Sequence, residues 1–408
     1  MDIVTIVSSL ARNRLGALLV TVQICLTLII VLNAAGVVRE HVARMQSISG
    51  VDEGNVFSLT NRWIGQPTDS PARVARDLAV LRATPGVVDA VSTNGVPLSN
   101  RGWGTKVDTK PLDPAKSMNL YGAQLYYLDE HGSNALGLRM TSGRWFTAQE
   151  VDGVAEPNAQ PLVIITKALA GRLYPQGNAL GNNLYTQGTR PSVIIGIVAN
   201  LQSSSPDSLS LDAVSVQSSV IMPQRMALPV LNNYIVRTRP GALAGAMKEA
   251  ERRLRAEEPL RVITEFRPFA ETRVDIYRVN RTLTMILVSV SVLLLAVTGL
   301  GIVGLTSYWV AQRRRVIGVR RALGARRSDI LSYFLTENLV VVAAGTILGL
   351  ALAIALNLWL TRTLGMPRID NRYMIIGALV TLALGQFAAL WPALRAASVP
   401  PALATRSA

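Results

Sequence analysis

The chain has 408 residues, of which 50% are hydrophobic and only 16% are charged, and its mean hydropathy is positive. These values indicate a membrane protein with a substantial polar portion and exclude an ordinary soluble globule. The net charge is +15, but residues 39–281 contribute a surplus of only five, because 27 basic residues there face 22 acidic ones. The rest of the surplus lies in arginines beside apolar runs, so we expect no nucleic-acid partner.

The residue types that build disulfides and zinc sites are scarce. Cys25 is the single cysteine and lies inside an apolar run, and the two histidines, His41 and His131, are far apart in the sequence. These residues exclude a disulfide framework and a cysteine–histidine zinc motif. We therefore predict no metal site. The serines and acidic residues of residues 39–274 form no catalytic constellation, so we also predict no catalytic residue and no bound cofactor in this chain.

Residues 15–38 form the first apolar run, with 24 uncharged residues after Arg12 and Arg14. At about 1.5 Å per residue, a helix of this length crosses the hydrocarbon core of about 30 Å. A signal peptide is the competing interpretation, but its apolar core is usually only ~7–15 residues long. We predict a cytoplasmic N-terminus and an uncleaved first transmembrane helix within residues 1–38.

Residues 39–274 carry most of the prolines and nearly all of the acidic residues, and short apolar runs alternate there with turn residues. This pattern predicts an α+β domain. The predicted strands cover 55–60, 87–91, 119–128, 161–166, 192–198, 214–222 and 234–238, and the predicted helices cover 71–84, 167–174 and 242–257. Trp103 stands between two glycines, which predicts a loop tip where it is either a contact residue or a partly buried anchor.

Residues 282–312 form the second and longest apolar run, with 31 uncharged residues. A helix of this length extends about 46 Å and exceeds the hydrocarbon core. Tilt would absorb part of the excess. Because no proline or glycine interrupts residues 272–281, we instead predict a stalk that continues into the second transmembrane helix over 275–311.

Residues 338–361 form the third apolar run, which predicts a third transmembrane helix over 330–361. Gly345 and Gly349 have the small-xxx-small spacing that lets helices approach closely, and we predict that they pack within the chain. Glu337, at the start of this run, requires a partner or a water-filled site. A short loop at 362–372, a fourth transmembrane helix at 373–394 and a cytoplasmic tail at 395–408 follow.

Residues 312–329 join the second and third runs and carry seven arginines against one acidic residue, Asp329. Val316, Val319 and Leu323 are spaced i, i+3 and i+7, so a helix here presents a narrow apolar strip. Gly324 predicts the end of that helix. Two interpretations stay open on these residues alone. The arginines either only fix membrane orientation under the positive-inside rule, or they belong to an amphipathic helix that a partner protein binds.

Four spans with both termini in the cytoplasm place eleven arginines on the cytoplasmic side, whereas the 362–372 loop on the other side has three. The positive-inside rule favours this orientation. It puts residues 312–329 in the cytoplasm and residues 39–274 outside it. The predicted fold is therefore an α-helical membrane protein with four transmembrane helices and a large α+β extracytoplasmic domain inserted between the first and second.

Several motifs in combination resemble the FtsX/MacB-like permeases of ABC transporters, the mechanotransmission class. The sequence IGVRRALGA at 317–325, followed by Asp329 and Ile330, is similar to the family's segment after its second span. LGLRMTSGRWF at 136–146 resembles the MacB-like periplasmic core domain, and PALRAASVP at 392–400 resembles the C-terminal pattern. One residue departs from the family, which usually has a glutamate just before the Ile-Gly pair, where this chain has Val316.

The resemblance implies a permease subunit of the inner membrane that works with a separate cytoplasmic ABC ATPase, as a homodimer or as a heterodimer with a second permease. The sequence holds no Gly-x-x-x-x-Gly-Lys-Ser/Thr phosphate loop, so ATP and Mg are expected in the partner chain. The implied function is efflux or extrusion of a periplasmic or envelope substrate, with a periplasmic adaptor or lipoprotein as a further partner. A non-transporting FtsX-like permease that activates a cell-wall hydrolase is the alternative.

The resemblance also implies which residues contact the ATPase. These coupling residues are Arg313, Arg314, Arg315, Val316, Ile317, Gly318, Val319, Arg320, Arg321, Leu323 and Gly324.

Overall fold

A computed structural model describes residues 14–64, 69–111, 121–153, 160–186, 190–206, 216–364 and 368–398. The chain divides into two compact units, one formed by residues 1–43 and 280–408 and the other by residues 44–279. We call them the membrane unit and the extracytoplasmic domain. The cytoplasmic positions predicted for the segment before residue 14 and for the tail after residue 398 lie outside the described residues, as does part of the 362–372 loop.

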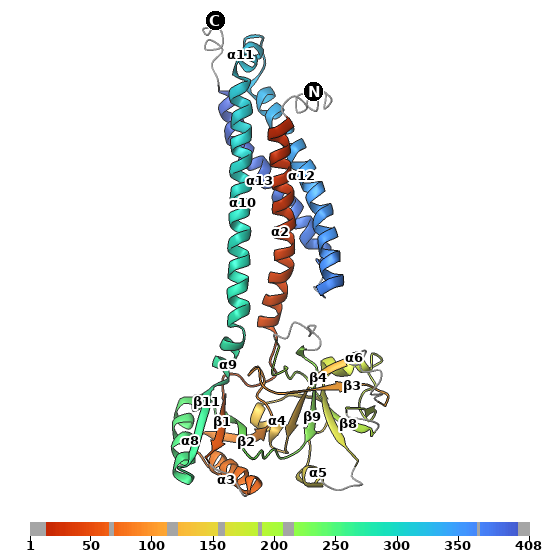
Figure 1. Ribbon diagram of the computed structural model, residues 1–408, viewed down its shortest axis with the longest axis vertical. Coiled ribbons are helices and arrows are strands. Elements are labelled where there is room, and N and C mark those ends of the chain that lie inside the picture. Colours follow the sequence, from red (N-terminus) through yellow and green to blue (C-terminus); the bar gives the residue numbers. More distant parts are fainter. Residues whose placement is uncertain are drawn as a thin grey trace. The chain divides into compact units, whose positions relative to one another are not determined.

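Within the described residues of the membrane unit, four helices are long and apolar enough to cross a bilayer, as the apolar runs predict. They are α2 (Arg14–Gln46), α10 (Arg278–Gln312), α12 (Arg327–Leu364) and α13 (Asn371–Ala397). A short helix, α11 (Arg314–Ala322), connects α10 to α12. Figure 1 shows α2, α10, α12 and α13 as neighbouring helices, with α11 at one end of this bundle.

Helix α2 packs closely on α12 of the same chain at two glycines. A Cβ added to Gly345 would lie 2.9 Å from the Cβ of Ile24, and one added to Gly349 would lie 3.1 Å from the Cα of Cys25. A Cβ at Gly345 would force its neighbour to shift and one at Gly349 would be crowded, so both glycines allow the backbones to approach closely. On its other side α2 contacts α10, where the Thr27 and Thr298 hydroxyls share a buried hydrogen bond of 2.8 Å.

Helix α10 begins at Arg278 and does not continue from residue 272, although no proline or glycine intervenes. A separate helix, α9 (Phe269–Ile276), ends just before it, at Tyr277. The Tyr277 ring is buried, and its hydroxyl accepts a 2.9 Å hydrogen bond from Gln202 Nε2. This tertiary contact places the tyrosine at the break between the helices. With 35 residues, α10 is still about 52 Å long.

The extracytoplasmic domain contains two sheets, which confirms the α+β class. A four-stranded antiparallel sheet has the order β11-β1-β10-β2, and a seven-stranded mixed sheet has the order β3-β4-β9-β6-β8-β5, with β7 paired to β8. The strands are β1 (Val56–Trp63), β2 (Val87–Thr93), β3 (Trp103–Val107), β4 (Tyr121–Leu128), β5 (Met140–Gly143), β6 (Leu162–Thr166), β7 (Asn183–Leu184), β8 (Ser192–Val198), β9 (Ser219–Pro223), β10 (Leu231–Thr238) and β11 (Arg261–Pro268). The other helices that lie within the described residues of the domain include α3 (Ser70–Arg82), α4 (Gly132–Leu136), α5 (Ala148–Asp152), α6 (Lys167–Leu173) and α8 (Leu243–Glu257).

Three hydrophobic cores hold this domain together, because successive strand residues point to opposite faces. In β10, Tyr234 and Val236 face α3 and α8, which lie together against one side of the four-stranded sheet (Figure 1). Ile235, between them, faces a second core that the two sheets share with α4. A third core, which includes Leu169, lies between the other face of the seven-stranded sheet and α6. The domain is thus large enough to bury its own apolar surface.

Most of the predicted strands and helices of the domain match observed elements, and the strand at 192–198 coincides with β8. Helix α3 begins where Asp69 accepts a 3.1 Å hydrogen bond from the backbone N–H of Ala72, an N-cap typical of aspartate. The strand predicted over 214–222 is wrong at its start. Val216 is helical, β9 begins only at Ser219, and residues 214 and 215 lie outside the described part.

Two features of the edge strands escaped prediction. Strand β11 has little apolar alternation, because it lies at a sheet edge and has an irregular register near Glu265, whose φ is 49°. Trp103 does not lie at a loop tip but begins the edge strand β3. Its ring is 46% exposed and meets Tyr127 edge to face at 5.9 Å between centroids, so it is a half-buried sheet residue.

Glu150 in the first turn of α5 gives the domain a specific pH dependence. The hydrogen bonds from Arg144 lower the pKa of this carboxyl from 4.5 to about 2, helped by the backbone N–H of Thr147. A depressed folded-state pKa stabilises the domain above the unfolded value and loses that contribution as pH falls towards the folded value. We therefore expect the stability advantage of the wild-type fragment 44–279 over its Glu150→Gln variant to shrink between about pH 4.5 and 2.

Urea midpoints at a series of pH values measure this difference. The pair is partly exposed, so salt screens it and the advantage should be smaller in 1 M salt than at low ionic strength. A difference that does not change with pH would show that the ion pair contributes nothing.

Candidate functional site

The short helix α11 is set off from α10 and α12 by local backbone chemistry. Arg313 interrupts α10 with φ −103° and ψ 10°, and α11 starts at the next residue. Gly324 has a φ of 99°, a left-handed conformation that glycine adopts without strain, and it ends the helix. The backbone N–H of Arg326 then donates a 2.9 Å hydrogen bond to Asp329 Oδ2 at the start of α12. The result is a nine-residue helix between two spans.

One face of α11 is packed on the membrane helices. Ile317 is only 5% exposed and joins a cluster with Ile330 and Phe334 of α12, and with alanines near the end of α13. Arg321 reinforces this attachment, because its Nη1 donates a 2.9 Å hydrogen bond to the backbone carbonyl of Ala397. Any force on α11 is therefore applied directly to α12 and α13.

Away from Ile317, α11 and its C-cap residue Leu323 expose the predicted apolar strip. Val316, Val319 and Leu323 are 54%, 49% and 83% exposed. Such a strip, rimmed by charge, is typical of a surface that a partner protein covers.

The arginines around α11 differ in their environments. Arg313 is paired, with Nη1 at 2.7 Å from Glu337 Oε2 and at 3.1 Å from the Tyr333 hydroxyl. Glu337 is fully buried, so this pair meets the requirement that an ionisable group near the bilayer has a partner. By contrast, five arginines make no ion pair with any residue that the structure describes, and all five are exposed: Arg314, Arg315, Arg320, Arg326 and Arg327.

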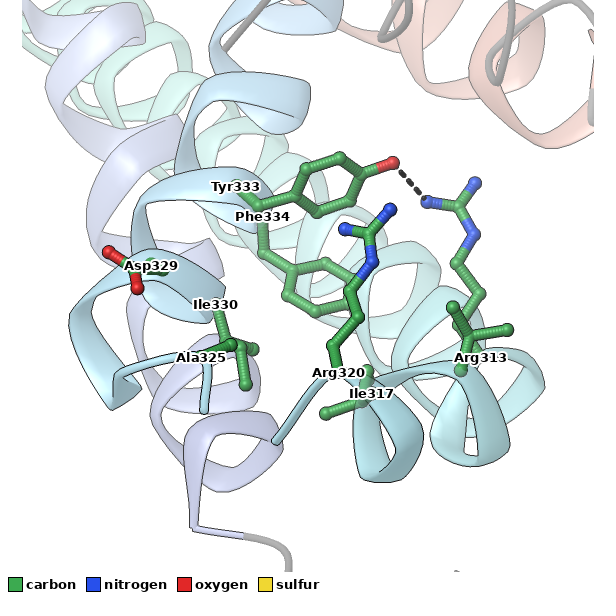
Figure 2. A pocket seen from close by; sticks show the side chains of 9 residues that line it. Arg313, Ile317, Arg320, Ala325, Asp329, Ile330, Tyr333 and Phe334 are labelled. Atoms are coloured by element: carbon green, nitrogen blue, oxygen red, sulfur yellow. Dashed lines mark hydrogen bonds between the residues drawn. The ribbon is translucent and has the colours of Figure 1, made fainter. Parts of the chain in front are cut away.

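A pocket of about 150 Å³ lies between α11 and the first turns of α12. Figure 2 shows Ile317, Ile330 and Phe334 on its apolar side, and the guanidinium groups of Arg313 and Arg320 beside the Tyr333 ring. The Arg320 guanidinium lies 5.6 Å from the centroid of that ring, a cation–π contact. Val316 and Asp329 also line the pocket.

The structure brings four of the eleven sequence-predicted coupling residues together around this pocket, namely Arg313, Val316, Ile317 and Arg320, and places the other seven elsewhere on α11 or just beyond its ends. It adds three residues of α12 that sequence reasoning missed: Ile330, Tyr333 and Phe334. Tyr333 precedes Glu337 by one helical turn and so lies on the same face of α12. The predicted need of Glu337 for a partner could therefore have pointed to Tyr333 as part of the site. Gly345 and Gly349 do not belong to the site, because they face α2. Within the described residues, no three His, Cys, Asp or Glu side chains converge to hold a metal ion.

Comparison with known families gives two matches that together cover most of the chain. Residues 18–254 match the MacB-like periplasmic core domain, and residues 288–401 match the FtsX-like permease C-terminal region. The first match alone covers more than half of the chain. The first match spans most of α2 and the extracytoplasmic domain as far as α8, and the second spans most of α10 with α11, α12 and α13.

Similar proteins include the macrolide export ATP-binding/permease protein MacB of Agrobacterium fabrum, which is 31% identical over 228 residues. That alignment covers 54% of this chain and 33% of the relative, so the chain spans about a third of that protein's length. The uncharacterized ABC transporter permease YvrN of Bacillus subtilis is 24% identical over 300 residues, 71% of each chain.

The chain is also similar to a crystal structure of the periplasmic region of MacB from Actinobacillus actinomycetemcomitans. The superposition covers 54% of this chain and 92% of that one, with 14% identity and a TM-score of 0.33. The family assignment rests on the two family matches. The chain therefore belongs to the FtsX/MacB-like permeases of ABC transporters.

Proposed function

We propose that this permease transmits the motion of a separate cytoplasmic ATPase through its membrane helices to the extracytoplasmic domain, and so drives extrusion of a periplasmic or envelope substrate across the cell envelope. In this proposal the partner ATPase binds ATP and Mg. Two permease chains, identical or different, work together in the inner membrane.

One observation carries the proposal: α11 is exposed on one face and firmly attached on the other. The exposed face offers the strip Val316, Val319 and Leu323 together with arginines that are free of acidic partners among the described residues. The attached face packs Ile317 on both α12 and α13. A helix with these two faces can take up the displacement of a bound protein and pass it to two spans at once.

The charge distribution supports the placement of α11 in the cytoplasm. Seven arginines in residues 312–329 lie on the side of the membrane that the positive-inside rule assigns to the cytoplasm. The long helices α2 and α10 lead from the extracytoplasmic domain into the membrane unit. Motion of α11 relative to these helices would therefore reach the domain without requiring a substrate path through the bilayer.

The experiment compares co-purification of the cognate ATPase with the wild type and with the double variant Arg320→Glu, Leu323→Asp. We expect the double variant to recover at least roughly tenfold less ATPase than the wild type. The reason is that a charge is reversed and an anchor side chain is lost at the interface. The matched control is Arg139→Glu, Leu260→Asp, which changes an exposed arginine and an exposed leucine in the extracytoplasmic domain. Equal retention by all three proteins would contradict the coupling role of α11.

The extracytoplasmic domain is expected to bind a periplasmic adaptor or lipoprotein. Pull-down with fragment 44–279 from envelope extract, followed by mass spectrometry, identifies the partner class. Recovery of a cell-wall hydrolase in place of an adaptor or lipoprotein would overturn the transport function and support a signalling permease.

A further inference from the structure

The pocket between α11 and α12 has an apolar side and a positively charged side. Ile317 and Phe334 are buried at the apolar side. The guanidinium groups of Arg313 and Arg320 flank the Tyr333 ring on the other (Figure 2). Such a combination suits a ligand group that has methylenes and ends in an anion.

Only one of these two arginines has a carboxylate partner within the described part of the chain. Arg313 is held by Glu337 at 2.7 Å. Arg320 is exposed, and among the described residues its guanidinium makes a cation–π contact with the Tyr333 ring, at 5.6 Å from the ring centroid, and no ion pair. Asp329 lies across the pocket, and its carboxylate points away from Arg320 (Figure 2) while accepting the hydrogen bond from the Arg326 backbone N–H.

Helix α11 itself offers Arg320 no carboxylate. On a helix, a side chain pairs with residues three and four positions away. For Arg320 these positions hold Val316, Ile317, Leu323 and Gly324. Val316 occupies the position one turn before Arg320, where a glutamate could pair with that arginine but a valine cannot. The Val316 side chain lines the pocket and is 54% exposed. No described carboxylate therefore pairs with Arg320, and its exposed guanidinium can bind a carboxylate of a partner protein.

We propose that this pocket receives an acidic side chain of the partner ATPase, whose carboxylate pairs with Arg320 while its methylene groups contact Ile317 and Phe334. The inference rests on the proposed function, because it names the chemistry by which the same partner binds. The arginines at 314, 315, 326 and 327 are exposed and belong to the same short segment as Arg320, so they add to its positive charge, which favours an acidic surface on the partner.

The test places the missing carboxylate on α11. Val316→Glu would pair with Arg320 one turn away and occupy the position of the partner's acid, whereas Val316→Gln changes the side chain equally in size without the charge. We expect the glutamate variant to bind the cognate ATPase roughly tenfold more weakly than the glutamine variant, with the loss mainly in the association rate and smaller at high salt. Binding is measured with the full chain in phosphatidylcholine nanodiscs.

A second pair of variants separates the pocket from the general charge of α11. Val319→Glu and Val319→Gln make the same change on the same exposed strip, but Val319 does not line the pocket. We expect this pair to differ by only about twofold to threefold. Equal ratios at positions 316 and 319 would overturn the inference, because the ATPase would then respond only to net charge.

An anionic lipid headgroup is the other source of an anion for Arg320. Native mass spectrometry of the ATPase-free chain counts bound phosphatidylglycerol in both position-316 variants. Loss of a bound lipid in Val316→Glu, with ATPase binding equal in the two variants, would assign the pocket to lipid and overturn the inference. Failure of the proposed function gives a different result from failure of this inference. The proposed function fails only if the double variant Arg320→Glu, Leu323→Asp retains the ATPase as well as the wild type does.

Discussion

Replacing Glu337 by alanine is expected to lower the free energy of unfolding of the membrane unit by about 3–5 kcal/mol and to loosen α11 from α12. Glu337 is fully buried, and its carboxylate holds Arg313 Nη1 at 2.7 Å and 3.0 Å from its two oxygens. Removal of the acid leaves the guanidinium of Arg313, whose side chain is only 21% exposed, without a counter-charge. An unpaired buried charge costs far more than the loss of a surface ion pair.

Equilibrium unfolding in mixed detergent micelles measures this change. The informative control is the double variant Arg313→Ala, Glu337→Ala, which removes both charges and should be more stable than Glu337→Ala alone. The single variant should also bind the ATPase more weakly, because Arg313 is the residue at which α10 gives way to α11. If the single and double variants unfold at the same denaturant concentration, the pair does not hold α11 in place.

The second large effect is expected in the extracytoplasmic domain. Asp77 on α3 accepts hydrogen bonds from Arg261 Nη2 at 2.9 Å and from the Tyr234 hydroxyl at 2.9 Å, and the side chains of Asp77 and Arg261 are 2% and 1% exposed. Asp77→Ala leaves the Arg261 guanidinium buried and unpaired, so we expect the domain to lose about 3–5 kcal/mol of stability. This pair joins α3 to the edge strand β11 across the core.

Urea unfolding of fragment 44–279 tests the effect. Asp77→Leu combined with Arg261→Met replaces the pair with apolar side chains of similar volume and should recover most of the loss, since no charge is then left buried. A surface pair on the same domain, Glu251 with Arg255, provides the comparison. Glu251→Ala should cost less than about 1 kcal/mol. An Asp77→Ala variant as stable as Glu251→Ala would contradict the structural role of the buried pair.

The sequence predicted the parts of this protein that depend on local pattern. Four uncharged runs of sufficient length indicated the four membrane helices, and the short apolar run at 192–198 indicated β8. The spacing of Val316, Val319 and Leu323 indicated one exposed strip on a helix that ends at Gly324. Each of these features follows from helix or strand periodicity, or from backbone preferences of single residues, and these are already present in a short stretch of chain.

Other features were not visible locally, because they depend on what a segment packs against. Strand β11 is recognisable only once β1 lies beside it, since its own residues alternate weakly. The break at Tyr277 lies where the buried tyrosine hydroxyl accepts a hydrogen bond from Gln202, a residue far away in the sequence. Trp103 is placed by its pairing in β3 and by the ring of Tyr127, not by its two flanking glycines. In each case a long-range contact overrides the local preference.

For the site, the sequence alone determined that residues 312–329 form a basic segment with an apolar strip, and that Glu337 needs a partner. Only the tertiary structure decided which of seven arginines meets Glu337, and that Arg320 lies over Tyr333 without a carboxylate among the described residues. The physical reason is that charge and periodicity are properties of the chain. The choice of a counter-ion depends on how α10, α11 and α12 meet, and Arg313 is the arginine that this junction brings within 2.7 Å of Glu337.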